Sequence, residues 1–389
     1  MKNIVFITNS IFTFGGEQRV VCIIANELCK YYNVTIFTTD NPLSKENPYN
    51  LSSAISVKYF RPFKANVFIK GIRFFLRFPL FKQFKNLSFI QKLIFYNKKM
   101  ANNLNKTLNY GNDYDLIIAV SGELTMLLGL AQQNGLKTKT IGWEHNSFEA
   151  YFRTRNLLFY KMDKLWLYCT KYINKFILLN EDYVEKYKKA FGCNCTYIYN
   201  PRSFVSNKKS TCKNKDFIVC CRFVKGKGID LLLKSFALFC KKNTDWQLKI
   251  VGDGPLKQEY IKYINKNHIE NRVIFLGKRY DINQLLIDSS IYVLPSRWEG
   301  FPMSLTEAYE VGIPAIFFDI PATIPFRKNN EGICCKSYNV QEYADAMLKL
   351  ASDESLRIKM GKNAIKFAES ISIENIILQW QKEINELLN

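Results

Sequence analysis

The sequence predicts an α/β protein built from two doubly wound parallel sheets. The chain has 389 residues, of which 48% are hydrophobic, so it is globular but too long for one ordinary core. Short apolar segments alternate with amphipathic ones along the whole chain, which is typical of strands alternating with helices in a parallel sheet. One polar, basic stretch near residues 203–216 interrupts this alternation, and we interpret it as a linker.

The N-terminal half carries six predicted strands, each short and apolar. They cover residues 3–8, 34–39, 115–120, 139–143, 175–180 and 196–200. Helices are predicted between them, for instance over Glu17–Tyr31 and Glu181–Phe191. We therefore expect an N-terminal Rossmann-like domain over residues 1–203.

The alternation restarts after the linker and predicts a second domain over residues 204–372. Its predicted strands cover residues 217–221, 246–252, 273–277, 291–295 and 315–318. A helix is expected from Ile229, and another over Ser304–Glu310, where Gly312 stops it. Residues 373–389 contain an amphipathic helix whose apolar stripe needs a partner surface.

The composition excludes several classes of protein. No stretch of 18 or more apolar residues is present, so no segment is long enough to span a bilayer. The 11 cysteines form no CxxC pair and only two histidines accompany them, which argues against a zinc finger or a disulfide framework. We expect reduced thiols in a cytoplasmic protein. No metal site is predicted.

The formal net charge of +21 is concentrated in part of the chain. No acidic residue occurs from Asn47 to Asn112, and the segment of about 61–100 interleaves basic and aromatic side chains. Three interpretations are open: a solvated face over core aromatics, a surface for anionic lipid, or a nucleic-acid site. The many Phe and Leu side chains exceed what base stacking needs, so the membrane interpretation is favoured over nucleic acid.

Glycine-rich loops follow several predicted strands, where parallel sheets bind ligands. Gly15 and Gly16 precede a helix and either approach a phosphate or sugar or form a tight turn. Arg222 and Lys227 flank a helix start and either bind a diphosphate or remain solvated. The later loop VGDGP lacks the third glycine of a dinucleotide fingerprint, which argues against NAD.

Three further residues are candidates for chemistry. His145 follows a predicted strand and is either functional or a satisfied structural histidine. Glu299 and Glu307 are eight residues apart around a Gly-Phe-Pro turn. For Glu307 the structural alternative is a capping box with Ser304, although such a box leaves Glu299 unexplained.

Taken in order, these loops resemble the retaining glycosyltransferases of family 4, which have the GT-B fold. The resemblance covers nearly the whole chain. Its specific parts are the E-x7-E element Glu299…Glu307, the R-x4-K pair Arg222…Lys227 and VGDGP at 251–255. The GG loop, the histidine loop and IYNP at 198–201 agree in position. The resemblance implies that the N-terminal domain binds the acceptor and faces the membrane with its basic, aromatic segment, and that the second domain binds the nucleotide sugar. It also implies that the C-terminal helix crosses back to the N-terminal domain.

The resemblance also implies a role for each matching residue. Glu307 would accept hydrogen bonds from a nucleotide ribose. Glu299, with backbone groups of Gly300, Phe301 and Met303, would hold hydroxyl groups of the transferred sugar.

The remaining roles concern the phosphates, the reacting carbon and the base. Arg222 and Lys227 would neutralise the diphosphate, with the glycine loop at Gly16 closing on it. His145 would touch the donor sugar near its reacting carbon. The base would meet the loop formed by Gly277, Lys278 and Arg279.

The function expected from this resemblance is retaining transfer of a hexose or N-acetylhexosamine from a nucleotide sugar, with UDP as the expected nucleotide and without a metal or other cofactor. The expected acceptor is a lipid-linked or amphiphilic glycan, such as a polyprenyl-diphosphate glycan or a lipopolysaccharide core. The expected location is peripheral, at the cytoplasmic face of a bacterial membrane, with no nucleic-acid partner. The alternatives are a sugar-nucleotide epimerase or phosphorylase of the same fold and a non-catalytic basic membrane-binding protein.

Overall fold

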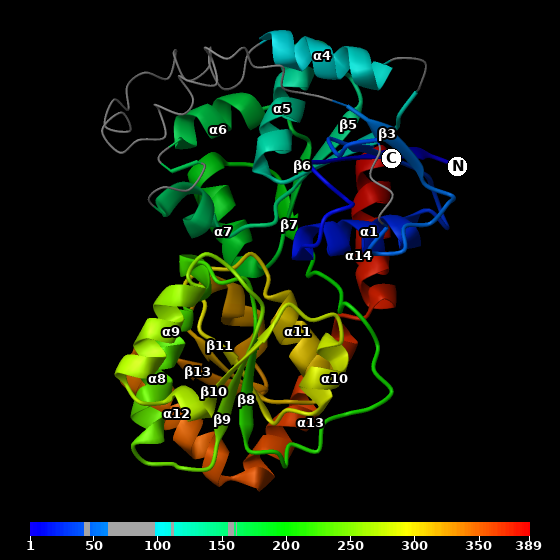
Figure 1. Cartoon of the computed structure of the whole chain (residues 1–389). Coiled ribbons are helices and arrows are strands. Elements are labelled where there is room, and N and C mark those ends of the chain that lie inside the picture. Colours follow the sequence, from blue (N-terminus) through cyan, green and yellow to red (C-terminus); the bar gives the residue numbers. More distant parts are fainter. Residues whose placement is uncertain (43–46, 61–97, 110–112, 155–158, 161) are drawn as a thin grey trace. The chain divides into compact units, whose positions relative to one another are not determined.

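The computed structural model describes residues 1–42, 47–60, 98–109, 113–154, 159–160 and 162–389. The chain divides into two compact units (Figure 1). The N-terminal unit comprises Met1–Tyr199 and Ile373–Asn389, and the C-terminal unit comprises Asn200–Ser372. Most of the basic, aromatic segment predicted at about 61–100 lies outside the described residues, which resume at Lys98.

The N-terminal unit contains a parallel sheet of seven strands in the order β3-β2-β1-β4-β5-β6-β7. The strands are β1 (Asn3–Thr8), β2 (Asn33–Thr38), β3 (Ser56–Tyr59), β4 (Leu116–Val120), β5 (Lys139–Trp143), β6 (Lys175–Leu178) and β7 (Cys195–Tyr197). The central strands β1 and β4 are buried almost along their whole length, as expected of a sheet covered on both faces. The chain order reverses between β1 and β4, so ligands are expected at the carboxyl ends of these strands.

Helices cover both faces of this sheet because its right-handed crossovers run in opposite directions from β1 and β4. They are α1 (Gly16–Leu28), α4 (Lys98–Asn109), α5 (Gly122–Gln133), α6 (Asp163–Thr170), α7 (Glu181–Phe191) and α14 (Ile373–Leu388). Helices α4, α5 and α6 pack in succession, whereas α1 packs against α14. A short π-helix, Glu149–Arg153, precedes α6.

Helix α14 returns the chain to the N-terminal unit, which confirms the predicted crossing of the C-terminal helix. Its Trp380 is 1% exposed, and the ring lies edge-on to Trp143 with 4.8 Å between centroids. Glu383 forms an ion pair with Lys175 at the start of β6. The apolar stripe of α14 is therefore buried on the sheet of the first unit.

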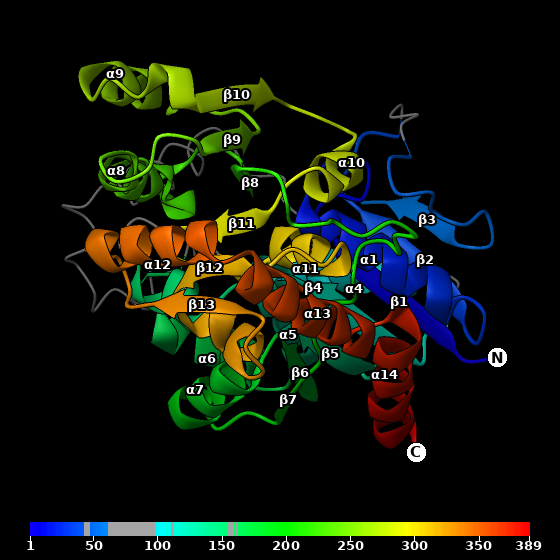
Figure 2. The same cartoon turned by 90° about the horizontal axis from the view of Figure 1, so that it is seen from below.

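The C-terminal unit contains a parallel sheet of six strands in the order β10-β9-β8-β11-β12-β13. The strands are β8 (Asp216–Cys220), β9 (Gln247–Val251), β10 (Val273–Gly277), β11 (Ile291–Leu294), β12 (Ala315–Phe318) and β13 (Gly332–Cys335). Two helix layers enclose it (Figures 1 and 2). The first contains α8 (Ile229–Cys240), α9 (Lys257–Lys266) and α12 (Val340–Ser352), and the second contains α10 (Ile282–Ile287), α11 (Met303–Glu310) and α13 (Glu354–Ser370).

The stretch interpreted as a linker is anchored to the C-terminal unit. Glu310, at the end of α11, is 1% exposed. Its carboxylate accepts hydrogen bonds from Arg202 Nη1 (2.8 Å), the backbone N–H of Ser206 (2.9 Å) and Lys209 Nζ (2.8 Å). The two cations and the N–H outweigh the cost of burial and lower the pKa of Glu310.

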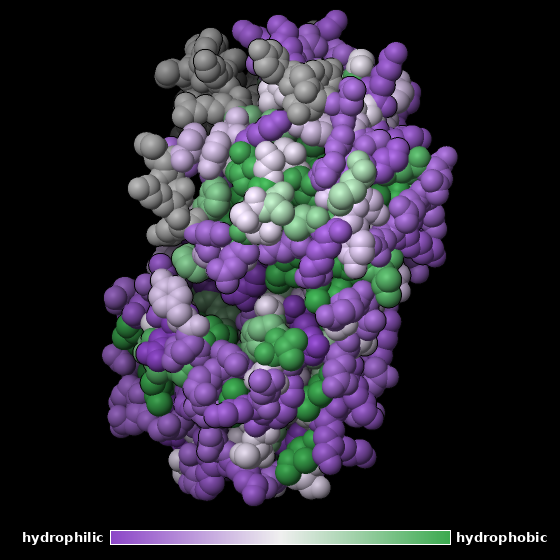
Figure 3. Space-filling model, turned by 90° about the vertical axis from the view of Figure 1, so that its right-hand side faces the viewer, coloured by the Kyte–Doolittle hydropathy of each residue, from purple (hydrophilic) through white to green (hydrophobic). Residues whose placement is uncertain are grey.

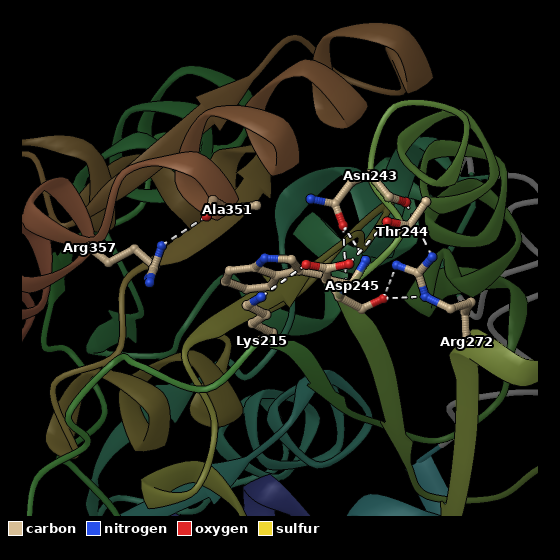
Figure 4. Close-up of polar contacts among 8 residues, drawn as sticks. Lys215, Asn243, Thr244, Asp245, Arg272, Ala351 and Arg357 are labelled. Carbon is tan, nitrogen blue, oxygen red and sulfur yellow. Dashed lines mark hydrogen bonds and ion pairs between the residues drawn. The ribbon is translucent and has the colours of Figure 1, made fainter.

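Side chains close the amino edge of the C-terminal sheet (Figure 4). Arg272, which precedes β10, donates Nε to the carbonyl of Trp246 (2.6 Å) and Nη1 to that of Asn243 (3.2 Å). Arg357 donates Nη1 to the carbonyl of Ala351 (3.2 Å), and its guanidinium carbon lies 5.1 Å from the Trp246 ring centre. The carbonyl groups named here are hydrogen-bonded to side chains of the same unit. We therefore expect a ligand at the opposite, carboxyl edge of the sheet.

The two parallel sheets confirm the predicted α/β class. Each of the eleven predicted strands has a counterpart, and β3 and β13 are additional. The capping box at Ser304 and Glu307 is wrong: α11 begins at Met303, and the Ser304 hydroxyl accepts a hydrogen bond from Tyr292 Oη at 2.7 Å instead.

Hydrophilic side chains cover most of the face in Figure 3, with smaller hydrophobic groups between them. Within the described ranges, no helix is both long and apolar enough to cross a membrane.

Candidate functional site

The loops after β8 and β11 meet at the carboxyl edge of the C-terminal sheet. The two strands are hydrogen-bonded neighbours, and the chain order reverses between them. This is the switch point where doubly wound sheets bind ligands. The first loop carries Arg222 and Lys227, and the second leads from Pro295 through Glu299 into α11.

Lys227 and Glu299 form an ion pair that joins the two loops. Lys227 Nζ lies 2.6 Å from Glu299 Oε1 and 2.8 Å from Oε2. Ser296 Oγ, from the second loop, donates a hydrogen bond to Glu299 Oε1 at 2.7 Å. Burial opposes the charge on Lys227, but the Glu299 carboxylate outweighs it, so the pKa of Lys227 is raised. Lys227 therefore keeps its proton through the physiological pH range.

Arg222 differs from Lys227 in its surroundings. Its side chain is exposed, and it forms no ion pair or side-chain hydrogen bond with the residues that the structure describes. Its backbone carbonyl accepts the N–H of Val224 at 2.9 Å, which turns the chain after the strand. The loop thus holds one cation in an ion pair and presents a second to solvent.

Close packing fixes the shape of the two loops. A Cβ atom at Gly228, where φ is +67°, would lie 1.9 Å from the carbonyl oxygen of Pro295. A Cβ atom at Gly226 would lie 2.8 Å from the Trp298 ring. The contact at Gly228 requires glycine, because its backbone is left-handed and a backbone carbonyl has little freedom to move, whereas a side chain at Gly226 would have to displace the partly exposed Trp298 ring. The spacing of Lys227 between two glycines therefore follows from its packing against the second loop.

A second charged pair supports the loop of Glu299 from behind. Arg297 binds Asp230 through both nitrogens, with Nη1–Oδ1 at 2.7 Å and Nη2–Oδ2 at 2.6 Å. Arg297 Nη1 also donates to the carbonyl of Lys225 at 2.8 Å. Bidentate pairs of this kind fix orientation as well as charge. Arg297 and Asp230 were not predicted, because their contact joins loops that are about 70 residues apart in the chain. Ser296 was not predicted either, although its contact with Glu299 lies within one loop.

Glu307 lies in α11 and is 7% exposed. Glu307 lies close to Cys220, at the end of β8. Burial raises the pKa of the Cys220 thiol, and the charge of Glu307 raises it further. The turn before it is largely buried, and Phe301 packs on Phe326 with 5.2 Å between ring centroids. Two carboxylates are thus held at one sheet edge, Glu299 in the loop and Glu307 in the helix.

The other predicted loops of this unit lie at the same edge. Gly252, at φ +126°, would place a Cβ atom 1.9 Å from the carbonyl oxygen of Cys221. Gly252 and Gly254 therefore let the β9 loop pack against the β8 loop. Gly277 ends β10 at φ +68°, and Lys278 and Arg279 follow it as exposed residues. Arg279 pairs with Asp281, with Nε–Oδ1 at 2.8 Å.

The remaining predicted residues belong to the N-terminal unit. Gly15 has an extended backbone, and its N–H donates to Tyr49 Oη at 2.6 Å. Gly16 is exposed at the start of α1. His145, after β5, is 9% exposed and packs on Trp143 with 4.4 Å between ring centroids. Burial lowers the pKa of His145 to about 3, so this imidazole is neutral at physiological pH.

The described residues include no cluster of side chains suited to bind a metal ion. Within the ranges that the structure describes, no group of three or more His, Cys, Asp or Glu side chains is arranged to hold a metal ion. All eleven cysteines are free thiols. Polar side chains and backbone groups therefore make up the candidate site.

Comparisons with known proteins agree with this architecture. Residues 203–367 match the family described as "Glycosyl transferases group 1". An uncharacterized glycosyltransferase from Haemophilus influenzae is 29% identical over 394 residues, covering 98% of this chain and 99% of its own. The Escherichia coli UDP-Gal:alpha-D-GlcNAc-diphosphoundecaprenol alpha-1,3-galactosyltransferase is 34% identical, over 29% of this chain and 30% of its own.

Solved structures agree on the fold. An Anabaena protein, HepE, crystallised with UDP and glucose, superposes with a TM-score of 0.74 at 18% identity, covering all of both chains. The chain accordingly has the GT-B fold. Together with the sequence matches, this supports a glycosyl-transfer role.

Proposed function

We propose that this protein transfers a hexose or N-acetylhexosamine from a UDP-linked donor to a membrane-associated glycan acceptor, with retention of the anomeric configuration. The observation that carries the proposal is the Lys227–Glu299 pair at the switch point of the C-terminal sheet. It places a cation and a carboxylate side by side where doubly wound sheets bind nucleotides.

The charges match the two ends of a nucleotide sugar. A diphosphate is anionic, and the β8 loop carries three cations, of which Lys227 is held in the ion pair while Arg222 and Lys225 are exposed. Sugar and ribose hydroxyls are neutral hydrogen-bond donors, and carboxylates are good acceptors of such hydrogen bonds. In the proposal Glu299 holds hydroxyls of the transferred sugar, together with backbone groups of Gly300, Phe301 and Met303. Glu307 holds the ribose.

The proposed reaction builds up negative charge beside the cations of the β8 loop. When the bond between the sugar and the diphosphate breaks, negative charge grows on the leaving phosphate, and Arg222 and Lys227 stabilise it. The leaving phosphate takes the proton of the acceptor hydroxyl, and the acceptor oxygen bonds the sugar's anomeric carbon on the face that the phosphate leaves, so neither a carboxylate base nor a carboxylate nucleophile is needed. His145 touches the sugar near its reacting carbon, and Gly16 approaches the diphosphate. The proposal includes neither a metal nor a cofactor.

A UDP donor is supported by two of the compared proteins. The E. coli relative is named for a UDP-galactose donor, and the Anabaena structure contains UDP. In the proposal the uracil meets the turn at Gly277, Lys278 and Arg279. Gly277 is the position there that needs a left-handed backbone.

An amphiphilic acceptor at a membrane is supported by the E. coli relative and by the surface of the N-terminal unit. That relative acts on a diphosphoundecaprenol-linked sugar, by its name. In this chain, α4 and α6 flank α5 and expose basic side chains. We place the protein at the cytoplasmic face of a bacterial membrane, where α4 and α6 meet anionic lipid.

The test is a donor screen with the purified protein. UDP-glucose, UDP-galactose, UDP-N-acetylglucosamine and UDP-N-acetylgalactosamine are incubated without acceptor, and slow release of UDP is measured. We expect one of them to be hydrolysed, at a rate that EDTA does not change, and NMR to show that the free sugar is first released as the anomer present in the donor. Conversion of one UDP-sugar into another would instead identify an epimerase. Loss of hydrolysis on adding EDTA would contradict the metal-free reaction.

A further inference from the structure

A second group of carboxyl side chains lies at the carboxyl edge of the N-terminal sheet. Strands β1, β4 and β5 are adjacent, so the loops that follow them meet at one edge. Glu17 follows β1 in the first turn of α1, Ser121 follows β4, and Glu144 follows β5. No local sequence pattern marks this group, because its members are about 20 to 130 residues apart.

Ser121 has a strained backbone. Its φ of 72° and ψ of 151° fall in a region that non-glycine residues rarely adopt. The conformation is held from both sides: the Ser121 N–H bonds the carbonyl of Trp143 at 2.9 Å, and the Ser121 carbonyl accepts the N–H of Thr125 at 3.1 Å. The strain directs the hydroxyl toward Glu17, to which it donates a hydrogen bond. Strain of this kind persists where the surrounding structure enforces it, and it is common at functional sites.

Glu17 has capacity for a further donor. Ser121 is its hydrogen-bond partner among the described residues, and a carboxylate can accept several hydrogen bonds. Burial and the neighbouring Glu123 raise the pKa of Glu17, against the Ser121 hydrogen bond. The side chain is nevertheless partly exposed, so it is within reach of a ligand.

Glu144 is fully buried, and no cation neutralises it. It is 0% exposed, and neither carboxyl oxygen has a hydrogen bond of good geometry with the part of the chain that the structure describes. The hydroxyls of Thr125 and Tyr151 lie beside it, and Tyr151 Oη accepts the N–H of Gly122 at 3.1 Å. Burial, aided by the charge of Glu17, raises the pKa of Glu144 to about 8. Glu144 therefore holds a proton at neutral pH and supports the start of α5.

This arrangement suits a neutral hydroxyl and disfavours a phosphate. Glu17 forms no ion pair with Lys or Arg among the described residues, so its carboxylate repels an anion placed beside it, and the protonated Glu144 adds no positive charge to offset that repulsion. His145 adds an uncharged imidazole whose Nε2 has no hydrogen-bond partner among those residues. Carboxylates and neutral imidazoles are good acceptors of hydroxyl hydrogen bonds.

We propose that Glu17 and Ser121 form the subsite for the acceptor's hydroxyl groups, in which Glu17 accepts a hydrogen bond from an acceptor hydroxyl and Glu144 positions the loop that carries Ser121. The inference rests on the proposed function, because it assigns the acceptor to the N-terminal unit. Glu17 touches the substrate, whereas Ser121 and Glu144 are positioning residues that act through it.

The test measures transfer of radiolabelled sugar from UDP-glucose, UDP-galactose or UDP-N-acetylglucosamine to the membrane fraction of a strain that lacks this protein. Glu17→Gln keeps the size of the side chain but removes its charge. We expect it to raise the membrane concentration needed for half-maximal transfer by about 10- to 100-fold, on the scale of one hydrogen bond to a charged group. UDP affinity, measured by titration calorimetry, should stay within about twofold of the wild type. Glu185→Gln, at an exposed position of α7, is the matched control.

Ser121→Gly separates positioning from stability. Glycine accepts φ 72° without strain, so the melting temperature should stay level or rise while transfer falls as in Glu17→Gln. Glu144→Gln should retain transfer because it mimics the protonated acid, and Glu144→Ala should lose it. Unchanged acceptor dependence in Glu17→Gln, or full transfer by Ser121→Gly, would overturn the inference. Failure of the wild-type protein to transfer any of the three sugars would instead overturn the proposed function.

Discussion

Glu299 is paired with the cation of Lys227, and this ion pair determines how each side chain can meet a ligand. Lys227 and Ser296 occupy its oxygens, so a sugar hydroxyl would join or replace an existing partner. A diphosphate that draws Lys227 toward itself would release Glu299 for the sugar. The pair thus links binding of the phosphates to binding of the sugar through two residues.

This linkage predicts non-additive effects on UDP-sugar binding. Lys227→Ala leaves the nearly buried Glu299 carboxylate without its cation, so the cost exceeds the loss of one phosphate contact. We expect the double variant Lys227→Ala/Glu299→Gln to bind UDP better than Lys227→Ala alone. Titration calorimetry with UDP measures both. If the two substitutions add independently, the pair does not couple the subsites.

Glu307 offers the most direct test of nucleotide recognition. Its replacement by alanine should weaken UDP binding by about 1.5–3 kcal/mol, the scale of hydrogen bonds to a charged group. Glu259→Ala, an exposed glutamate on α9, is the matched control and should bind like the wild type. UDP affinity in Glu307→Ala equal to that of the control would leave the carboxylate without a role in the nucleotide site.

The raised pKa of Glu144 predicts how stability depends on pH. Its ordinary pKa is 4.5 and the folded value is about 8, so between these values the folded chain holds a proton that the unfolded chain has released. The free energy of unfolding should therefore fall as pH rises, by up to about 1.4 kcal/mol per pH unit. Glu144→Gln should flatten this dependence in urea denaturation between pH 5 and 8. An equal slope in both proteins would show that Glu144 ionises normally.

At the scale of elements, the exposed side chains of α4 and α6 form the basic face available to a membrane. On α6, exposed residues recur at helical spacing. They are Lys164, Leu167 and Tyr168, and the exposed Lys171 and Tyr172 follow directly after the helix, which ends at Thr170. On α4 the exposed cations are Lys98, Lys99 and Lys106. Cations beside aromatic and aliphatic side chains are typical of surfaces that bind anionic lipid.

Charge reversal on this face should reduce membrane binding. We expect Lys99→Glu, Lys106→Glu, Lys164→Glu and Lys171→Glu together to lower sedimentation with phosphatidylglycerol-containing vesicles, because each cation near such a surface contributes about 1 kcal/mol. The matched control is Lys262→Glu/Lys266→Glu on α9, where both lysines are exposed. Undiminished sedimentation would exclude α4 and α6 and leave residues 61–97, which carry Arg73, Arg77, Lys82 and Lys85, as the next segment to reverse.

The predictable part of the molecule is the part encoded locally. Long buried strands such as β1 and β4 are continuous apolar runs, and the loops after them are marked by glycine and charge. Strand β3 is exposed at both ends and β13 is only partly buried, so neither stands out as an apolar run. The contacts of Arg297 and Ser121 join distant loops, and no local pattern encodes them. The roles of the predicted site residues remain predictions.

At the scale of the whole molecule, α14 ties the last described residues to the first sheet. Trp380 is buried against Trp143, and Glu383 pairs with Lys175. Replacing Trp380 by alanine should cost about 3–5 kcal/mol, because it leaves a large cavity. Calorimetry should show a lower melting temperature for the N-terminal unit and an unchanged one for the C-terminal unit. Equal shifts in both would mean that the units do not unfold independently.

The return of α14 also has a consequence for the order of events at the ribosome. The C-terminal unit, Asn200–Ser372, is inserted between two pieces of the unit that begins the chain. All of its strands are synthesised before α14, so it can close its core while Trp143 still lacks its partner. The unit made first is thus the one completed last, and a nascent chain stalled before Ile373 would expose the surface that α14 covers. That surface is where we would expect a chaperone to bind during synthesis.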